Sequence, residues 1–372
     1  MDKGNLVFSY ADVEGTRWMS RRIIRWLLAG VAVVIVAAAG AAGYVYVQLQ
    51  PPTTAVGETV VLEIPSGYGS AQVARLLEEK GLIRNAFVYR YYLAYHGVSN
   101  RLQAGKYRFV IGTDVAQITR DLVEGNVFRE TVKVTIPEGF RIEQIVARLE
   151  EAGLGSRERY LTLIQEHDFS QFPFVRNIPK DAPLKYRLEG YLFPDTYEFE
   201  KDADEVTVLT AMLERFAREL TPQRQERLRD LGLSVHQWVT MASLVEREAK
   251  VDKERPVIAG VLWNRLNENW LLQIDATVQY ILGEPKERLT YRDLEIDDPY
   301  NTYVYEGLPP GPIGAPGELS LEAVLYPQAH RYFFYVTKKD GTDEHYFAET
   351  HAEHEKNIAM SRQNERRRTG QP

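Results

Sequence analysis

The sequence predicts an α+β protein with a single N-terminal transmembrane helix, a small βααβ subdomain and a larger mixed α+β domain. An uncharged apolar run at 26–47 predicts the transmembrane helix. Beyond it, segments of alternating polarity predict strands, and they are interleaved with segments of helical periodicity. The 372 residues are 44% hydrophobic and 26% charged, which is enough to form the packed cores of two or three domains.

The composition excludes several classes of protein. The formal net charge of −7 argues against a general nucleic-acid binder, so we expect no nucleic-acid partner. The chain has no cysteine, which excludes disulfides, thiolate zinc sites, iron–sulfur clusters and a cysteine nucleophile. We therefore expect an activity that needs no metal and no cofactor.

The apolar run at 26–47 is long enough to cross a bilayer core of about 30 Å. The residues before it are basic, namely Arg17, Arg21, Arg22 and Arg25. The positive-inside rule then makes residues 1–25 a cytoplasmic tail and places the following residues outside the cytoplasmic membrane. A cleaved signal peptide is the alternative, because the small residues at 37–43 resemble a cleavage site. Both interpretations export the rest of the chain.

A short linker at 48–56 leads into the small subdomain at 57–130. Its sequence predicts a strand, two helices and a second strand, at 60–67, 70–82, 85–97 and 104–112. Part of this pattern recurs 72 residues later, because Ile64-Pro-Ser-Gly-Tyr matches Ile136-Pro-Glu-Gly-Phe. Two related strand–helix units are therefore expected, serving either as a glycan-binding surface or as a scaffold.

The most informative segment of the domain at 131–357 is the helix expected at 234–249. Ser234 followed by Gln237 forms a capping-box pattern that fixes its start. On a helical wheel Glu246 falls within the apolar stripe, whereas Arg247 and Glu248 point elsewhere. A carboxyl group on an apolar face is unfavourable unless it is paired, protonated or functional.

Two interpretations of Glu246 remain open. A glutamate that keeps its proton near neutral pH is what a general acid for glycosidic cleavage requires. A buried ion pair with Arg255 or Arg265 is the structural alternative. The polar and aromatic loops at 187–199 and 298–317 suit an extended glycan, whose sugar hydroxyls Gln273, Asp275 and Gln279 would bind. A hairpin is expected from 332–336 and 345–348, and a basic solvated tail at 358–372.

Seven motifs in series resemble the endolytic murein transglycosylase (MltG, YceG-like) family. They are EGYLFPDTYEF (189–199), ASLVEREA (242–249), NRL (264–266), LQIDATVQY (272–280), YNTY (300–303), GLPPGPI (307–313) and HYFAETHAEH (345–354). The resemblance implies a membrane-anchored lyase that cuts MurNAc–GlcNAc bonds within peptidoglycan strands. It would leave 1,6-anhydroMurNAc ends and so limit the length of nascent strands.

The same resemblance assigns residues and partners. It implies that Glu246 is the catalytic acid and that Gln273, Asp275, Asn301 and Tyr303 contact the glycan. It also implies that residues 57–130 are a LysM-like subdomain. The expected partners are peptidoglycan glycan strands, the cytoplasmic membrane and cell-wall synthase complexes.

Three alternatives to the lyase remain. A hydrolytic muramidase would need a second carboxylate, for which Glu189, Asp195 and Asp275 are candidates. A non-catalytic anchor would bind peptidoglycan and recruit cell-wall synthases. A metal enzyme would use the histidines near the end of the sequence, namely His345, His351 and His354.

Overall fold

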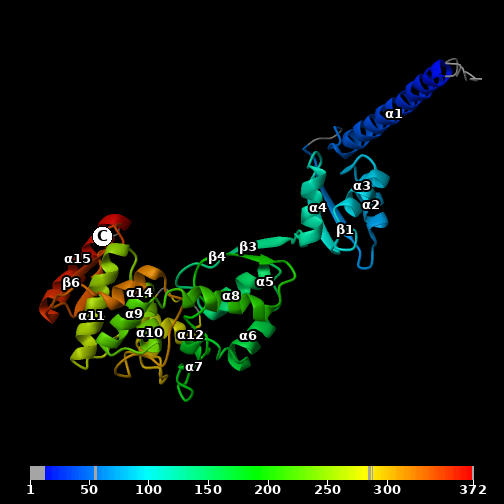
Figure 1. Ribbon diagram of the computed structural model, residues 1–372. Helices are drawn as coiled ribbons and strands as arrows, with labels where there is room; N and C mark the ends of the chain where they lie inside the picture. The colour runs from blue at the N-terminus through cyan, green and yellow to red at the C-terminus, as the bar shows by residue number, and fades with distance from the viewer. Residues whose placement is uncertain (1–12, 54–56, 284–285, 287, 371–372) are drawn as a thin grey trace, which may run out of the picture. The chain divides into compact units, whose positions relative to one another are not determined.

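The computed structural model describes residues 13–53, 57–283, 286 and 288–370, and it has the predicted α+β character (Figure 1). The chain forms two compact units, Met1–Arg129 and Glu130–Pro372. Each of them carries helices together with short antiparallel strand pairs.

The first unit contains the expected apolar helix. α1 spans Val13–Leu49. Its segment Ile23–Leu49 has a mean hydropathy of 2.3, and none of its apolar stretch is buried against the rest of the protein. Its length and composition allow it to cross a membrane, although a signal sequence would meet the same criteria. Of the predicted cytoplasmic tail, residues 1–12 lie outside the described residues, as do 54–56 of the linker.

The rest of the first unit has the predicted βααβ order. Its elements are β1 (Thr59–Ile64), α2 (Ser70–Glu79), α3 (Ala86–Tyr95), β2 (Gly105–Val110) and α4 (Val115–Glu124). β1 and β2 pair antiparallel, with Leu62 opposite Tyr107. Both of these side chains are buried, because alternate residues of a strand face the same side of the sheet.

The second unit begins with a repeat of this arrangement. Its first elements are β3 (Thr131–Thr135), α5 (Ile142–Glu151), α6 (Arg157–Glu166), α7 (Pro173–Arg176), β4 (Thr196–Glu200) and α8 (Glu205–Ala217). β3 pairs antiparallel with β4, which encloses α5 and α6 as β1 and β2 enclose α2 and α3. α2 and α5 start and end 72 residues apart, so the two predicted strand–helix units are confirmed.

The remaining elements of the second unit are mostly helical. They are α9 (Pro222–Leu231), α10 (Val235–Glu248), a 3₁₀ turn (Asp252–Glu254), α11 (Arg255–Asn267), α12 (Asp275–Leu282), α13 (Tyr291–Leu294), α14 (Glu318–Leu325), β5 (Phe334–Thr337), β6 (His345–Ala348) and α15 (His351–Thr369).

α10 is the central helix of this part of the chain. The predicted capping box is confirmed, since the Gln237 N–H donates to Ser234 Oγ at 3.1 Å and Gln237 Oε1 accepts from the Ser234 N–H. α10 packs against α11 and α14, and the buried Trp238 donates its indole N–H to the Leu321 carbonyl at 2.8 Å. Helix α10 is thereby fixed along its length, which positions the residues at its C-terminal end.

The C-terminal segment differs from the prediction in one respect. The hairpin is confirmed, because β5 and β6 pair antiparallel. Residues 358–372 were expected to form a solvated tail, but α15 continues to Thr369 and packs against both strands. Ser361 is buried, and Asn364 donates to the Lys338 carbonyl at 2.9 Å, so these contacts hold the helix. Arg366, Arg367 and Arg368 are exposed, as expected.

Candidate active site

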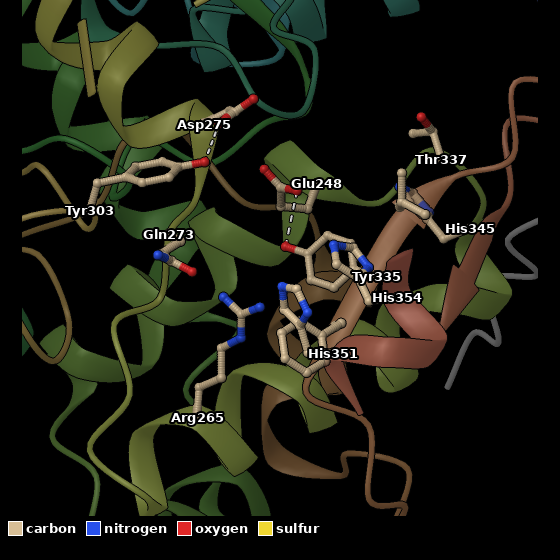
Figure 2. A pocket seen from close by; sticks show the side chains of 12 residues that line it. Glu248, Arg265, Gln273, Asp275, Tyr303, Tyr335, Thr337, His345, His351 and His354 are labelled. Carbon is tan, nitrogen blue, oxygen red and sulfur yellow. Dashed lines mark hydrogen bonds between the residues drawn. The ribbon is translucent and has the colours of Figure 1, made fainter. Parts of the chain in front are cut away.

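A cavity of about 410 Å³ lies where the C-terminal end of α10 meets the hairpin and α15. Figure 2 shows Glu248 between the pair Asp275–Tyr303 on one side and the histidines on the other. The lining side chains are Glu248, Arg265, Gln273, Asp275, Tyr303, Phe334, Tyr335, Val336, Thr337, His345, His351 and His354. Polar groups from α10, α11, the start of α12, the loop at Tyr303, the two hairpin strands and α15 therefore converge on one concave site.

Glu248 is the carboxyl group at the centre of this site. It is the last residue of α10, and its Oε2 accepts a hydrogen bond from the Tyr335 hydroxyl at 3.0 Å. Burial raises the pKa of Glu248 to about 7, and the charge of Asp275 adds to this effect, while the Tyr335 hydrogen bond opposes it. A substantial fraction of Glu248 is therefore protonated at neutral pH, as a general acid must be.

Three of the predicted glycan contacts lie in the same cavity: Gln273, Asp275 and Tyr303. Gln273 adopts the left-handed backbone conformation (φ 49°), and its N–H donates to the Thr302 carbonyl at 3.0 Å. The Tyr303 hydroxyl donates to Asp275 Oδ1 (Figure 2). Burial and this hydrogen bond raise the pKa of Tyr303, so its hydroxyl remains a donor at neutral pH.

Arg265 joins the two sides of the cavity. Its guanidinium donates to the Leu272 carbonyl at 2.6 Å and to the Phe333 carbonyl at 2.7 Å. These bonds tie the loop that carries Gln273 to the segment that leads into β5. Burial lowers the pKa of Arg265, and the charges of Tyr335, Tyr303 and Glu248 oppose this effect.

Three histidines line the cavity from the hairpin and α15. His345 Nδ1 lies 2.7 Å from Glu254 Oε2, and its backbone N–H donates to Glu254 Oε1 at 2.9 Å. His354 has a buried Nδ1 without a hydrogen-bond partner, and burial lowers the pKa of this residue. His354 thus offers a neutral ring to the cavity. Over the described part of the chain, no group of three or more His, Cys, Asp or Glu is placed to hold a metal ion.

Glu246 does not lie in the cavity. Its Oε2 accepts from Arg255 Nη1 at 2.9 Å, from Ser320 Oγ at 2.8 Å and from the Gly317 N–H at 3.0 Å. The Glu246 side chain is 7% exposed and that of Arg255 is 8% exposed. This is the buried ion pair that was the structural alternative at the sequence level, and three donors around one oxygen suit a structural carboxylate.

Asn301 is also absent from the cavity. It is fully buried, and its amide donates to the carbonyls of Leu294 and Ile296 at 3.0 and 2.8 Å. Its Oδ1 accepts from the Tyr303 N–H at 3.0 Å. Asn301 therefore holds the loop that presents Tyr303, because all of its bonds in the structure are to backbone groups.

The candidate second carboxylates occupy three different environments. Glu189 is buried at the N-terminal end of α5, where it accepts from the Ile142 N–H and the Tyr280 hydroxyl, and burial raises its pKa to about 8. Asp195 pairs with Arg215 Nε at 2.6 Å. Asp275 alone of the three candidates lines the cavity with Glu248.

Sequence reasoning missed Glu248, Tyr335 and the histidines as members of one site. The motif at 242–249 contains both Glu246 and Glu248. The helical wheel favoured Glu246, because it lies within the apolar stripe. The partners of Glu248 come from β5 and α15, roughly ninety to a hundred residues further along the chain. Local periodicity contains no signal of such distant partners.

Comparison with known proteins places the chain in a family. The profile of the YceG-like family matches residues 62–360, which include every residue lining the cavity. The chain belongs to the YceG-like family. A curated YceG relative from Bacillus subtilis, named endolytic murein transglycosylase, is 35% identical over 83% of this chain and 86% of its own length.

Two further similarities agree with this assignment to the YceG-like family. A protein of the same name from Streptococcus pneumoniae is 29% identical over 88% of this chain and 63% of its own length. The crystal structure of a yceG-like protein from Listeria monocytogenes superposes with a TM-score of 0.54 at 34% identity. It covers 80% of this chain and 98% of the Listeria chain, so the similarity extends over most of the fold.

Proposed function

We propose that the protein is an endolytic peptidoglycan lytic transglycosylase, a lyase in which Glu248 is the catalytic acid and base. The family and the shared name of its relatives support the reaction class. The observation that carries the assignment of the acid is the raised pKa of Glu248 inside a polar cavity. Glu246, which the sequence favoured, is bound in a structural ion pair instead.

The proposed reaction needs one carboxyl group. Neutral Glu248 donates its proton to the oxygen that joins C1 of N-acetylmuramic acid to N-acetylglucosamine, and the C1–O bond breaks through an oxocarbenium-like state. The Glu248 carboxylate then takes the proton of the muramic C6 hydroxyl, whose oxygen bonds to C1 and closes the 1,6-anhydro ring. Glu248 ends the cycle protonated, and no water is consumed.

The other residues of the cavity support this step. We infer that Tyr335 orients the Glu248 carboxyl group through its 3.0 Å hydrogen bond. Gln273, Asp275 and Tyr303 supply polar groups for the sugar hydroxyl and N-acetyl groups, and Asn301 positions Tyr303.

We further propose the setting in which the reaction occurs. α1 anchors the chain in the cytoplasmic membrane with residues 1–25 inside and the rest outside, as the basic residues before the apolar segment favour. The βααβ subdomain at 57–130 is a LysM-like module that binds glycan, and the domain at 131–357 is catalytic. Cell-wall synthase complexes are the expected protein partners.

The mass of the products tests the proposed function. The full chain is reconstituted in vesicles and incubated with purified sacculi, and the released fragments are weighed. A lyase gives 1,6-anhydro ends that are one water lighter than hydrolysed reducing ends. Reducing ends alone would contradict the proposal and favour a muramidase, for which Asp275 is a second carboxylate in the same cavity. No cleavage would favour a non-catalytic anchor.

The pH dependence of cleavage gives a second test of Glu248. Because the acid must be protonated, kcat/KM is expected to fall as pH rises through about 7. The Tyr335 hydrogen bond lowers the pKa of Glu248, so Tyr335→Phe should raise that pKa and move the alkaline limb to higher pH. An unchanged alkaline limb in Tyr335→Phe would show that another group controls the profile.

A further inference from the structure

A second cavity, of about 240 Å³, lies beside the first and is positively charged. The two cavities share α10 and α12, because Glu248 and Asp275 line the first, whereas their chain neighbours Arg247 and Ala276 line the second. The second cavity is lined by Arg141, Gln144, Arg247, Ala276, Gln279, Tyr280 and Ile313. None of these described lining residues is acidic, so two guanidinium groups face a cavity without a carboxylate.

The two arginines differ in the contacts that they make with the rest of the protein. Arg141 Nη2 donates to the Gly283 carbonyl at 2.9 Å, which caps the C-terminal end of α12. Arg247 has no ion pair or hydrogen bond with any residue that the structure describes, and its side chain passes over Gly139. Partial burial, followed by repulsion from Arg141, lowers the pKa of Arg247, while the charges of Glu248 and Glu246 oppose this effect. An anion bound between the two guanidinium groups would relieve this repulsion.

We propose that this second cavity binds a carboxylate of the peptide that branches from the muramic acid next to the cleaved bond. The inference rests on the proposed function, because it takes Glu248 as the point of cleavage. N-acetylated sugars are uncharged, so the carboxylates of the branching peptide are the anions that a glycan substrate brings close to Glu248. Arginine favours them because its planar fork can hold a carboxylate through two hydrogen bonds.

The test compares strands that differ only in charge. Native peptide-bearing strands are set against strands whose peptide carboxylates have been converted to amides with a carbodiimide and ammonia. For the wild-type protein, kcat/KM is expected to be about 10- to 100-fold higher on native strands than on amidated strands. This is the effect expected from losing one charge-assisted hydrogen bond. Arg247→Gln should bring kcat/KM on native strands down to that on amidated strands. Arg148→Gln, a change of a half-exposed arginine on α5 that does not line the second cavity, is the control and should leave the preference intact.

The possible outcomes separate this inference from the proposed function. If Arg247→Gln keeps the wild-type preference, or if wild type cuts both substrates equally, the peptide site is wrong while the lyase assignment stands. If wild type releases no anhydro ends from either substrate, both proposals fail. Arg247 makes no described contact that folding needs, so misfolding is not expected to obscure the result.

An exposed aromatic surface in the first unit carries a second, independent inference. Phe87, Tyr91 and Tyr95 are 63%, 64% and 87% exposed, and they lie four residues apart along α3. Their spacing places them on one helical face, which we call the aromatic face of α3. These residues line an apolar groove of about 740 Å³ together with Ala41, Tyr44, Val45 and Leu49 of α1.

The aromatic face is held next to the end of the apolar helix. The Arg84 guanidinium donates to the Pro51 carbonyl at 2.8 Å and to the Gln50 carbonyl at 3.1 Å. Leu49 also packs against the core of the subdomain. The groove extends from Leu49 back to Ala41, about 12 Å along the helix axis at 1.5 Å per residue. Its α1 wall therefore belongs to the segment that is apolar enough to span a membrane.

The geometry points to the lipid bilayer as the occupant of this groove. The aromatic face of α3 would lie in the boundary between headgroups and acyl chains, where aromatic side chains are enriched. This inference rests on the proposed anchoring by α1. It implies that the subdomain rests on the membrane surface instead of moving freely at the end of its linker.

Spin labels can measure how deeply the aromatic face of α3 lies in the bilayer. Because the chain contains no cysteine, a label can be attached at one introduced cysteine at a time. Single-cysteine variants of the full chain carry a nitroxide in phosphatidylglycerol–phosphatidylethanolamine vesicles: Tyr91→Cys on α3, Val34→Cys within α1 and Glu79→Cys on the exposed side of α2. Two quantities are measured for each label: its accessibility to oxygen and its protection from a water-soluble nickel complex. For the label at position 91 we expect both quantities to lie between those of the labels at positions 34 and 79.

Each alternative occupant has its own signature. Membrane docking would be wrong, and the anchor still supported, if the label at position 91 were as accessible to the nickel complex as the label at position 79 while the label at position 34 was protected. Dipolar broadening at 91 would identify a second copy of the chain and also overturn it. A water-exposed label at 34 would refute the anchor and, with it, the inference.

Discussion

Replacing Glu248 with glutamine is expected to lower glycan cleavage by about 100- to 10,000-fold, the usual contribution of general acid–base catalysis. Glutamine keeps the shape of the side chain but can neither donate nor accept the proton. Because Glu248 is uncharged in the form that acts as acid, the cavity should tolerate the neutral amide and the fold should persist. The measurement is the rate of release of anhydro-ended fragments from sacculi, with the thermal unfolding midpoint recorded in parallel.

Glu246→Gln is the matched control, two residues away on the same helix. It removes the charge that pairs with Arg255, so the free energy of unfolding should fall while cleavage by the remaining folded protein continues. The opposite pattern, with activity lost in Glu246→Gln and kept in Glu248→Gln, would return the catalytic role to the residue that the sequence analysis favoured.

Replacing Arg255 with methionine is expected to have the largest effect on stability. Arg255 contacts Glu246 at 2.9 Å and Asp252 at 3.1 Å, and it lies 3.9 Å from Glu138. Burial and the charge of Glu246 already raise the pKa of Glu138, so removing the cation leaves carboxyl groups that repel one another. We expect a loss of about 3–5 kcal/mol in the free energy of unfolding, measured by denaturant titration.

Two further variants show whether this effect comes from the buried pair. Combining Arg255→Met with Glu246→Gln should restore part of the stability, because no unpaired anion then remains at position 246. Lys201→Met removes an ion pair with Glu130 whose side chains are 63% and 44% exposed, and it should change stability by less than about 1 kcal/mol. Equal losses in Arg255→Met and Lys201→Met would contradict a special role for the buried pair.

Local patterns predicted the elements of this fold well. The Ser234–Gln237 capping box placed the start of α10, and the alternating residues of β1 and β2 predicted the first strand pair. The 72-residue repeat predicted two related strand–helix units. Each of these signals depends on neighbours that are close in sequence, and such neighbours determine caps, turns and amphipathic faces.

The candidate catalytic centre depends on contacts that no local pattern records. The wheel correctly placed Glu246 on a buried face, but burial there serves an ion pair with Arg255. Glu248 lies at the end of α10, where Tyr335 comes from a strand far along the chain. The family resemblance implied that Asn301 contacts the glycan. Its amide instead turns inward to satisfy backbone carbonyls.

The wall of the cavity opposite α10 is made by the hairpin and by α15, so the pocket needs the chain as far as His354. If α1 anchors the chain as proposed, Glu248 is delivered first and these wall residues follow about a hundred positions later. Until they arrive, the acid has no Tyr335 beside it and no enclosed groove for sugar. In that topology the cavity around Glu248 is complete only once the chain has been translocated as far as His354.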